Sequence, residues 1–209
     1  MLNLDRTIHK LNEFAYQTLV HINPELSTRG STASVKSKFG DEPLNCIEIG
    51  VSYGNNAFNL LSVLNINKLF LVDPYIITDA FPQGAQTDWT LNDEPDVVYE
   101  KCKKRLKPFV EKTVFIRKPS AEANKHIIAH NLKIHYIYVD GNHSYESVKE
   151  DLALYYPLLA DGGVMGGDDF SGSFFGVCRA VLEFVDEHDL VLFGDKKDWW
   201  FVKDESSGT

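Results

Sequence analysis

The sequence has few of the features that mark disulfide-rich, zinc-binding or secreted proteins. Only three cysteines occur among its 209 residues, Cys46, Cys102 and Cys178, and no two of them form a CxxC pair. An odd number of scattered cysteines argues against a disulfide framework or a structural zinc site, and it favours a reducing compartment. We therefore expect each cysteine to be a small apolar side chain of the core.

Long apolar runs and an excess of basic residues are missing as well. No stretch reaches the ~18 apolar residues of a membrane span, and the first residues, MLNLDRTIHKLNEF, carry charges where a secretory signal needs an apolar segment. The 21 Lys and Arg face 30 Asp and Glu, so the net charge is −9. Such a chain repels nucleic acid backbones and anionic lipids. We expect a cytoplasmic protein with no membrane or nucleic-acid partner, and homo-oligomer formation stays open.

What is present points to one globular domain, since 44% of the residues are apolar and 12% are aromatic. From residue 44 onward, short apolar runs alternate with amphipathic segments. Buried strands are expected at LNCIEIG, KLFLVD, TVFIR, IHYIYVD and GGVMGGDD, and helices over 54–64, 97–108, 119–130, 144–158 and 174–187. The final segment, DLVLFGDKKDWWFVKDE, predicts an antiparallel hairpin. The pattern predicts an α/β fold with a doubly wound, Rossmann-like sheet of seven mostly parallel strands that ends in this C-terminal hairpin.

The N-terminal residues break this pattern. Apolar residues at helical spacing predict a helix over the first twenty residues, and the polar run STRGSTASVKSKFGDEPLN over 27–45 predicts a loop without regular structure. We accordingly divide the chain into an N-terminal helix and loop, 1–43, that could cap the acceptor side of a ligand site, and a main domain, 44–204. The connection 75–96 is longer than the ~2–6 residues usual in such folds, so it is either an acceptor-side lid or a surface excursion.

The turn after the first strand, IEIGVSYG, lies where doubly wound sheets bind their ligands. Gly50 and Gly54 are four residues apart, and Ser52 stands where a dinucleotide-binding motif has its second glycine. With Glu48 just before the turn, the site suits a cationic ligand without phosphates, such as S-adenosylmethionine. At the end of the second strand, Asp73 can accept hydrogen bonds from ribose hydroxyls. After the third strand, Ser120 opens a helix, and we place it near the adenine.

With the hairpin added, residues 44–203 resemble the class I S-adenosylmethionine-dependent methyltransferases. The most specific stretch, VDGNHSYESVKEDLALYYPLLADGGVMGGDDF, is similar to the signature of the small-molecule O-methyltransferases that act on macrolide and aminocoumarin sugars, and GVCRAVLEF is similar to their next helix. The resemblance implies metal-assisted methyl transfer to a hydroxyl, with the metal ligands falling on Asp140, Asp168 and Asp169.

The position of these three residues supports the same interpretation independently. Asp140 ends the fourth strand, and Asp168 and Asp169 end the fifth. Adjacent parallel strands lie ~4.8 Å apart, so carboxylates at their ends can converge on one ion. An all-oxygen site favours Mg²⁺ or another hard divalent cation. The alternative is that these aspartates only cap helices and close turns.

The sequence therefore predicts an S-adenosylmethionine-dependent O-methyltransferase whose acceptor is a small molecule with a hydroxyl group. Asp140 holds the ion that activates this hydroxyl, and His143 is either a general base and acceptor contact or a residue that only orients a carboxylate or caps the helix. Two rival interpretations remain: a non-catalytic or divergent protein that binds the S-adenosyl ligand, and an NAD-dependent oxidoreductase. The glycine spacing and the terminal hairpin disfavour the oxidoreductase.

Overall fold

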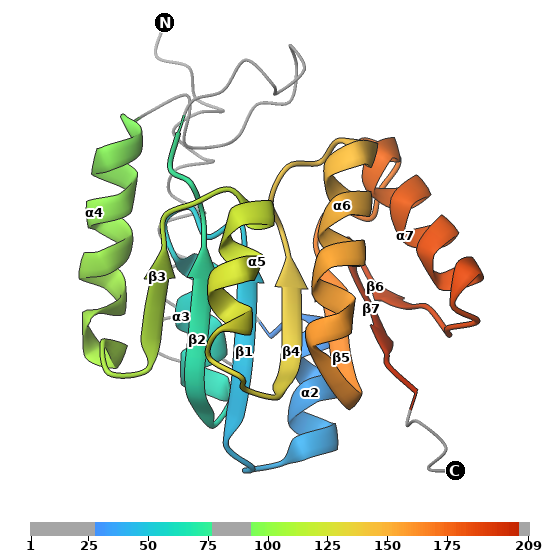
Figure 1. The fold of residues 1–209 in the computed structure, drawn as a ribbon, viewed down its shortest axis with the longest axis horizontal. Coiled ribbons are helices and arrows are strands. Elements are labelled where there is room, and N and C mark those ends of the chain that lie inside the picture. Colours follow the sequence, from blue (N-terminus) through green and yellow to red (C-terminus); the bar gives the residue numbers. More distant parts are fainter. Residues whose placement is uncertain (1–27, 77–92, 205–209) are drawn as a thin grey trace, which may run out of the picture.

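The structure, a computed structural model, describes residues 28–76 and 93–204 as one seven-stranded sheet flanked by helices (Figure 1). The strands are β1 (Leu44–Ile49), β2 (Ile66–Val72), β3 (Thr113–Ile116), β4 (Ile134–Val139), β5 (Leu159–Gly167), β6 (Phe193–Asp195) and β7 (Asp198–Val202). The helices are α2 (Gly30–Phe39), α3 (Asn55–Val63), α4 (Pro95–Leu106), α5 (Ser120–Ile128), α6 (Tyr145–Tyr155) and α7 (Phe175–Glu187), with short 3₁₀ turns η2 (Lys107–Phe109) and η3 (Tyr156–Leu158).

The strand order is β3-β2-β1-β4-β5-β7-β6, so the sheet reverses its winding between β1 and β4. Strands β1 to β5 pair in parallel, and β7 pairs antiparallel with both β5 and β6. The predicted Rossmann-like sheet and its C-terminal hairpin are confirmed. The five helices predicted from residue 54 onward each match an observed helix to within a few residues. In a sheet of this order, ligands bind outside the carboxyl ends of the strands, at the switch point between β1 and β4.

Two apolar layers cover the sheet because successive side chains of a strand point to opposite faces. Ile47, Ile137 and Met165 pack with α5, α6 and α7 on one face, whereas Cys46, Tyr136 and Val164 pack with α2, α3 and α4 on the other. Figure 1 shows α5 and α6 in front of the sheet and α2 and α3 behind it. Cys46 and Cys102 are buried as expected, but Cys178 is only partly buried.

The prediction that residues 27–45 have no regular structure is wrong. They contain α2, which packs against β5, β6 and β7, and the start of β1. The helix is polar and has almost no amphipathic pattern, so its formation depends on docking instead of local propensity. The docking contact is specific: the Ser31 backbone N–H donates to Asp198 Oδ2 at 2.6 Å, and the Ser31 hydroxyl donates to Asp198 Oδ1 at 3.1 Å. A carboxylate from β7 thus satisfies the free amino end of α2.

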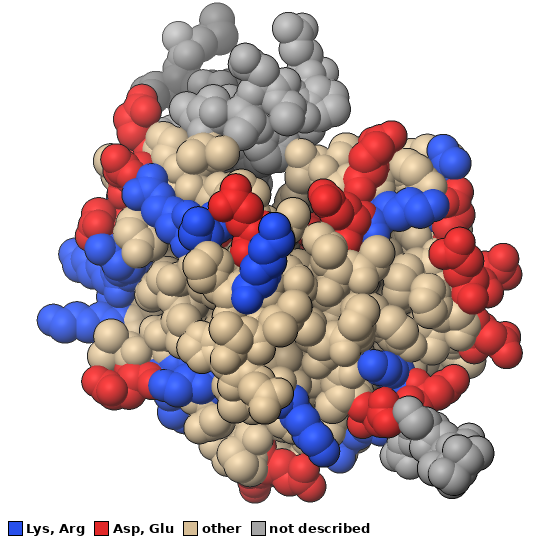
Figure 2. Space-filling view, in the orientation of Figure 1, with Lys and Arg blue, Asp and Glu red and all other residues tan. Residues whose placement is uncertain are grey.

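The predicted helix over the first twenty residues and most of the 75–96 connection lie outside the described residues. None of the helices within 28–76 and 93–204 is long and apolar enough to cross a membrane. The face of the molecule in Figure 2 carries charges of both signs around its edges and uncharged side chains over much of its middle.

Candidate functional site

The glycines of the first turn allow β1 and β4 to approach each other at the switch point. Gly50 has a φ of +82° and Gly54 a φ of +74°, values that side chains other than glycine rarely adopt. A Cβ atom on Gly50 would lie 1.9 Å from the Asp140 carbonyl oxygen, and one on Gly54 would lie 2.7 Å from Cys102 Sγ. The turn therefore needs glycine at both positions, and Gly50 places the backbone of β1 directly against the residue that ends β4.

Asp73 holds this turn in shape. Its Oδ2 accepts hydrogen bonds from the backbone N–H groups of Val51 and Ser52 at 3.0 and 2.9 Å, and its Oδ1 accepts one from Tyr75 at 2.8 Å. Burial raises the pKa of the Asp73 carboxyl, although these three N–H groups oppose the rise. The predicted ribose contact stays a prediction. The structure adds a role that sequence reasoning missed, because Asp73 fixes the loop that contains Ser52.

Glu48 is buried at the end of β1, with only 1% of its surface exposed. Asn56 Nδ2 donates to Glu48 Oε1 at 3.3 Å, and Oε2 has no hydrogen-bond partner among the described residues. Burial raises the pKa of this carboxyl to about 8, and the nearby Asp140 adds to the rise. A buried acceptor without a partner is costly, so it suits a ligand that brings a donor. The ammonium group of an S-adenosyl ligand is such a donor.

Ser120 begins α5, as the sequence predicted, but its polar groups face protein partners. Its hydroxyl donates a hydrogen bond to the buried Asp151 carboxyl, whose pKa burial raises to about 7. Its carbonyl oxygen accepts a hydrogen bond from the Tyr155 hydroxyl at 2.8 Å. These contacts tie α5 to α6, and the predicted proximity of Ser120 to the adenine stays a prediction.

Asp140, His143 and Asp169 come together at the carboxyl ends of β4 and β5. Each offers one ligand atom, and these atoms lie within 4.8 Å of one another. His143 Nε2 is 3.2 Å from Asp169 Oδ2 and 4.0 Å from Asp140 Oδ1. Burial raises the pKa of Asp140 to about 8 despite the nearby Arg29 guanidinium. Two carboxylates and an imidazole at this spacing can hold a divalent cation, and the cation would relieve the repulsion between the carboxylates.

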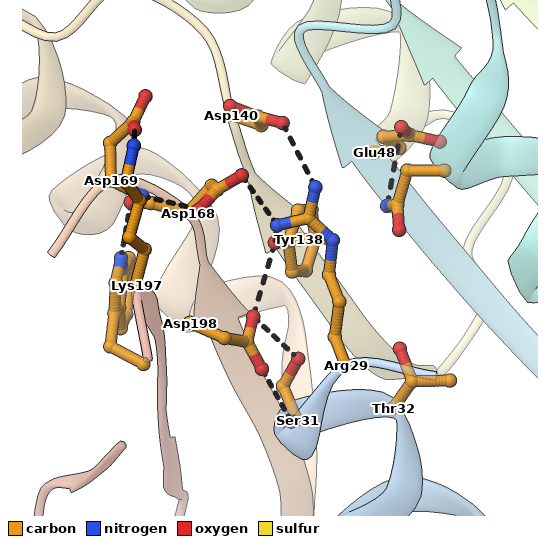
Figure 3. Close-up of polar contacts among 12 residues, drawn as sticks. Arg29, Ser31, Thr32, Glu48, Tyr138, Asp140, Asp168, Asp169, Lys197 and Asp198 are labelled. Atoms are coloured by element: carbon orange, nitrogen blue, oxygen red, sulfur yellow. Dashed lines mark hydrogen bonds and ion pairs between the residues drawn. The ribbon is translucent and has the colours of Figure 1, made fainter. Parts of the chain in front are cut away.

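Asp168 and Asp169 point in different directions although they are neighbours in the chain (Figure 3). Asp169 has a left-handed backbone with a φ of +62°, and its Oδ1 lies 3.6 Å from Lys197 Nζ. Asp168 Oδ2 instead forms an ion pair with Arg29 Nη1 at 2.6 Å. Burial alone would raise the pKa of Asp168, but the Arg29 guanidinium outweighs burial and holds that pKa below its usual value. Of the three predicted metal ligands, the structure thus brings two together with His143 and pairs the third with an arginine.

Sequence reasoning missed Arg29, Tyr138 and Asp198. The Arg29 guanidinium lies over the Tyr138 ring, 5.0 Å from its centroid, and donates to the Tyr138 hydroxyl. The same hydroxyl donates to Asp198 Oδ1 at 3.1 Å. The sequence gives little indication of this network: Tyr138 is one polar residue near the end of a buried strand, Arg29 lies in a segment predicted to be a loop, and Asp198 lies in the predicted hairpin.

Comparisons with known proteins agree with this fold. A family model described as a methyltransferase domain matches residues 47–170, and the chain belongs to this family. Its fold is that of the class I S-adenosylmethionine-dependent methyltransferases, with a likeness to a sugar O-methyltransferase. No curated protein matches the chain.

Three solved structures show the likeness of the fold. The apo structure of CalS11, a TDP-rhamnose 3'-O-methyltransferase of calicheamicin biosynthesis, has a TM-score of 0.59 at 15% identity, covering 88% of this chain and 85% of that one. An rRNA methylase from Streptococcus thermophilus has a TM-score of 0.58 at 13% identity, covering 84% and 95%. SMU.1697c from Streptococcus mutans, in complex with S-adenosylhomocysteine, has a TM-score of 0.59 at 14% identity, covering 83% and 95%.

Proposed function

We propose that this protein transfers a methyl group from S-adenosylmethionine to a hydroxyl of a small molecule, with the help of Mg²⁺ or another hard divalent cation. The observation that carries the proposal is the convergence of Asp140, His143 and Asp169 within 4.8 Å beside the Gly50 turn. The cofactor turn and the candidate metal ligands thus share one edge of the sheet, because the Gly50 backbone lies against Asp140. Methyl transfer needs the cofactor and the acceptor to lie close together and in line, and two binding sites on one edge of the sheet support the proposal.

The charge of the chain supports a small-molecule acceptor over RNA. The fold of an rRNA methylase matches about as well as that of CalS11, and at such low identity neither likeness assigns an acceptor. The net charge of −9 disfavours a phosphate backbone.

The residues form two adjacent sites, one for the cofactor and one for the divalent cation. Glu48 Oε2 would accept from the ammonium of the cofactor, Gly50 and Gly54 would let it approach the backbone, and Asp73 keeps the turn in shape for it. When bound, the cofactor supplies the methyl group and the divalent cation lowers the pKa of the acceptor hydroxyl. Asp140 and Asp169 would hold the cation, and Asp168 would join them as the third ligand once Arg29 has left it. His143, with Nε2 3.2 Å from Asp169 Oδ2, would orient that carboxylate.

The first test is ligand binding. Calorimetry with the full chain should show binding of S-adenosylhomocysteine and no binding of NAD, because Ser52 and the Gly50–Gly54 spacing do not suit a pyrophosphate. Heat from NAD with none from the S-adenosyl ligand would support the oxidoreductase alternative and contradict the proposal.

The protonation of Glu48 provides a sharper test of the cofactor site. Burial raises the pKa of this carboxyl to about 8, so most molecules carry it protonated at pH 7. Binding of an ammonium group favours the ionised form, and the protein should release up to one proton per S-adenosylhomocysteine bound. Calorimetry in two buffers of different ionisation enthalpy measures this release.

Glu48→Gln is the matched variant, because it keeps the shape and removes the ionisation. It should bind the ligand more weakly and without proton release, while the fold stays intact. Equal proton release in both proteins would show that the ammonium group binds elsewhere.

A further inference from the structure

Arg29 places a positive charge between two of the predicted metal ligands (Figure 3). Its Nη1 lies 2.6 Å from Asp168 Oδ2, and its Nη2 lies 3.9 Å from Asp140 Oδ2. The guanidinium also lies over the Tyr138 ring, with 5.0 Å between Arg29 Cζ and the ring centroid. One guanidinium therefore bridges the ends of β4 and β5, where a cation coordinated by both aspartates would have to bind.

The segment that carries Arg29 is held in place. Arg29 directly precedes α2, and the next two residues are anchored: a Cβ on Gly30 would lie 2.6 Å from the Trp200 ring, and Ser31 is bound to Asp198 at 2.6 Å. The backbone of Arg29 thus has a fixed position beside the site, and the side chain is the part that can move. With the side chain on Asp168, the possible ligand atoms that converge among the described residues belong to Asp140, His143 and Asp169.

We propose that Arg29 is an internal competitor of the divalent cation at Asp140 and Asp168. Mg²⁺ binds carboxylate oxygens at ~2.0–2.1 Å, and a guanidinium on the same Asp168 oxygen repels it. Coordination by both aspartates requires Arg29 to leave Asp168. In the metal-free protein Arg29 acts as the counterion of Asp140 and Asp168. The apparent affinity for the cation is therefore the intrinsic affinity multiplied by the fraction of molecules in which Arg29 has left Asp168. This inference rests on the metal-assisted function proposed above.

The test is Mn²⁺ binding to the full chain, measured by calorimetry, with no turnover required. Arg29→Gln should bind Mn²⁺ about tenfold more tightly than the unchanged protein, which corresponds to about 1.4 kcal/mol. Arg29→Lys keeps a charge without the planar fork and should fall between the two. Arg179→Gln, which breaks an exposed ion pair with Glu183 on α7, is the matched control and should leave the affinity unchanged.

Thermal unfolding is a second measurement, and it distinguishes competition between Arg29 and the cation from a purely structural role of Arg29. Without metal, Arg29→Gln should melt at a lower temperature, because Asp168 loses its ion-pair partner. At saturating Mn²⁺ the two melting temperatures should converge, because Arg29 has then left Asp168 in the unchanged protein too. A difference in melting temperature that persists at saturation would show that Arg29 is only a structural ion pair.

The outcomes separate the inference from the function on which it rests. If the unchanged protein binds Mn²⁺ and Arg29→Gln binds it equally or more weakly, Arg29 is not a competitor and the metal-assisted function stands. If neither protein binds Mn²⁺, both the inference and the metal part of the function are wrong. Binding of S-adenosylhomocysteine to each variant verifies that it is folded.

Discussion

Asp140→Asn should weaken binding of Mg²⁺ or Mn²⁺ by at least ~100-fold, since losing even the indirect support of a metal ligand costs ~10–100-fold. Asp140 is the one predicted ligand that takes part in both observed groupings, the cluster with His143 and Asp169 and the ion pair with Arg29. The variant keeps the shape of the side chain, so its affinity for S-adenosylhomocysteine should change little. Calorimetry with each ligand measures the two effects separately.

The neighbouring variants and a control make this result specific. Asp169→Asn should have a similar effect on metal binding, and Asp168→Asn a smaller one, because Asp168 is paired with Arg29 in the structure. Asp186→Asn on the exposed side of α7 is the control and should change nothing.

Turnover with a suitable hydroxyl acceptor should stop in excess chelator and return with Mg²⁺ or Mn²⁺. Full activity in chelator would contradict the metal role and would leave Asp140 or His143 as the general base. The pH profile of turnover would then show the ionisation of that base.

Gly50→Ala should destabilise the protein by ~2–5 kcal/mol, a large part of the ~5–15 kcal/mol by which domains are stable. Two costs add: a left-handed backbone costs a residue with a Cβ ~1–2 kcal/mol, and forcing a group into a packed site costs ~1–3 kcal/mol or more. Gly50 has a φ of +82°, and its Cβ would lie 1.9 Å from the Asp140 carbonyl oxygen. Urea unfolding followed by circular dichroism measures the loss.

Gly40→Ala is a control that carries only a backbone cost. Gly40 has a φ of +58°, and no described atom lies within 4 Å of its would-be Cβ. With a ψ of −119° its backbone lies in a region that is sparsely populated for residues with a Cβ, so the substitution should cost ~1–3 kcal/mol. Equal losses in both variants would mean that the approach of β1 to Asp140 is not tight in solution, and that the Gly50 turn does not position the metal ligands.

Strands and their ends could be predicted from the sequence because they depend on local patterns. Ile47, Ile137 and Met165 lie in continuous apolar runs, which parallel strands buried on both faces require. The residue that follows such a run must lie at the carboxyl edge of the sheet, so Asp73 and Asp140 could be placed there without coordinates, and Glu48 one residue before the end of β1. The cofactor class followed from the same local reasoning, because Ser52 stands where a pyrophosphate would need glycine.

Contacts between distant residues could not be predicted in this way. Arg29 meets Tyr138 across 109 positions and Ser31 meets Asp198 across 167, and no local pattern encodes either pair. Helix α2 was missed for the same reason. Its sequence has almost no apolar stripe, and the carboxylate that satisfies its amino end comes from β7.

By itself, the sequence determined the alternation of strands and helices, the terminal hairpin and the acidic residues at the strand ends, because each depends on residues near one another in the chain. Only the tertiary structure decided where those side chains point. Asp168 and Asp169 are adjacent in sequence, yet the left-handed backbone of Asp169 sends one carboxylate to Arg29 and the other to His143. The physical reason is that a strand end fixes the position of a Cα atom, whereas the partner of a charged side chain depends on which distant element folds against it.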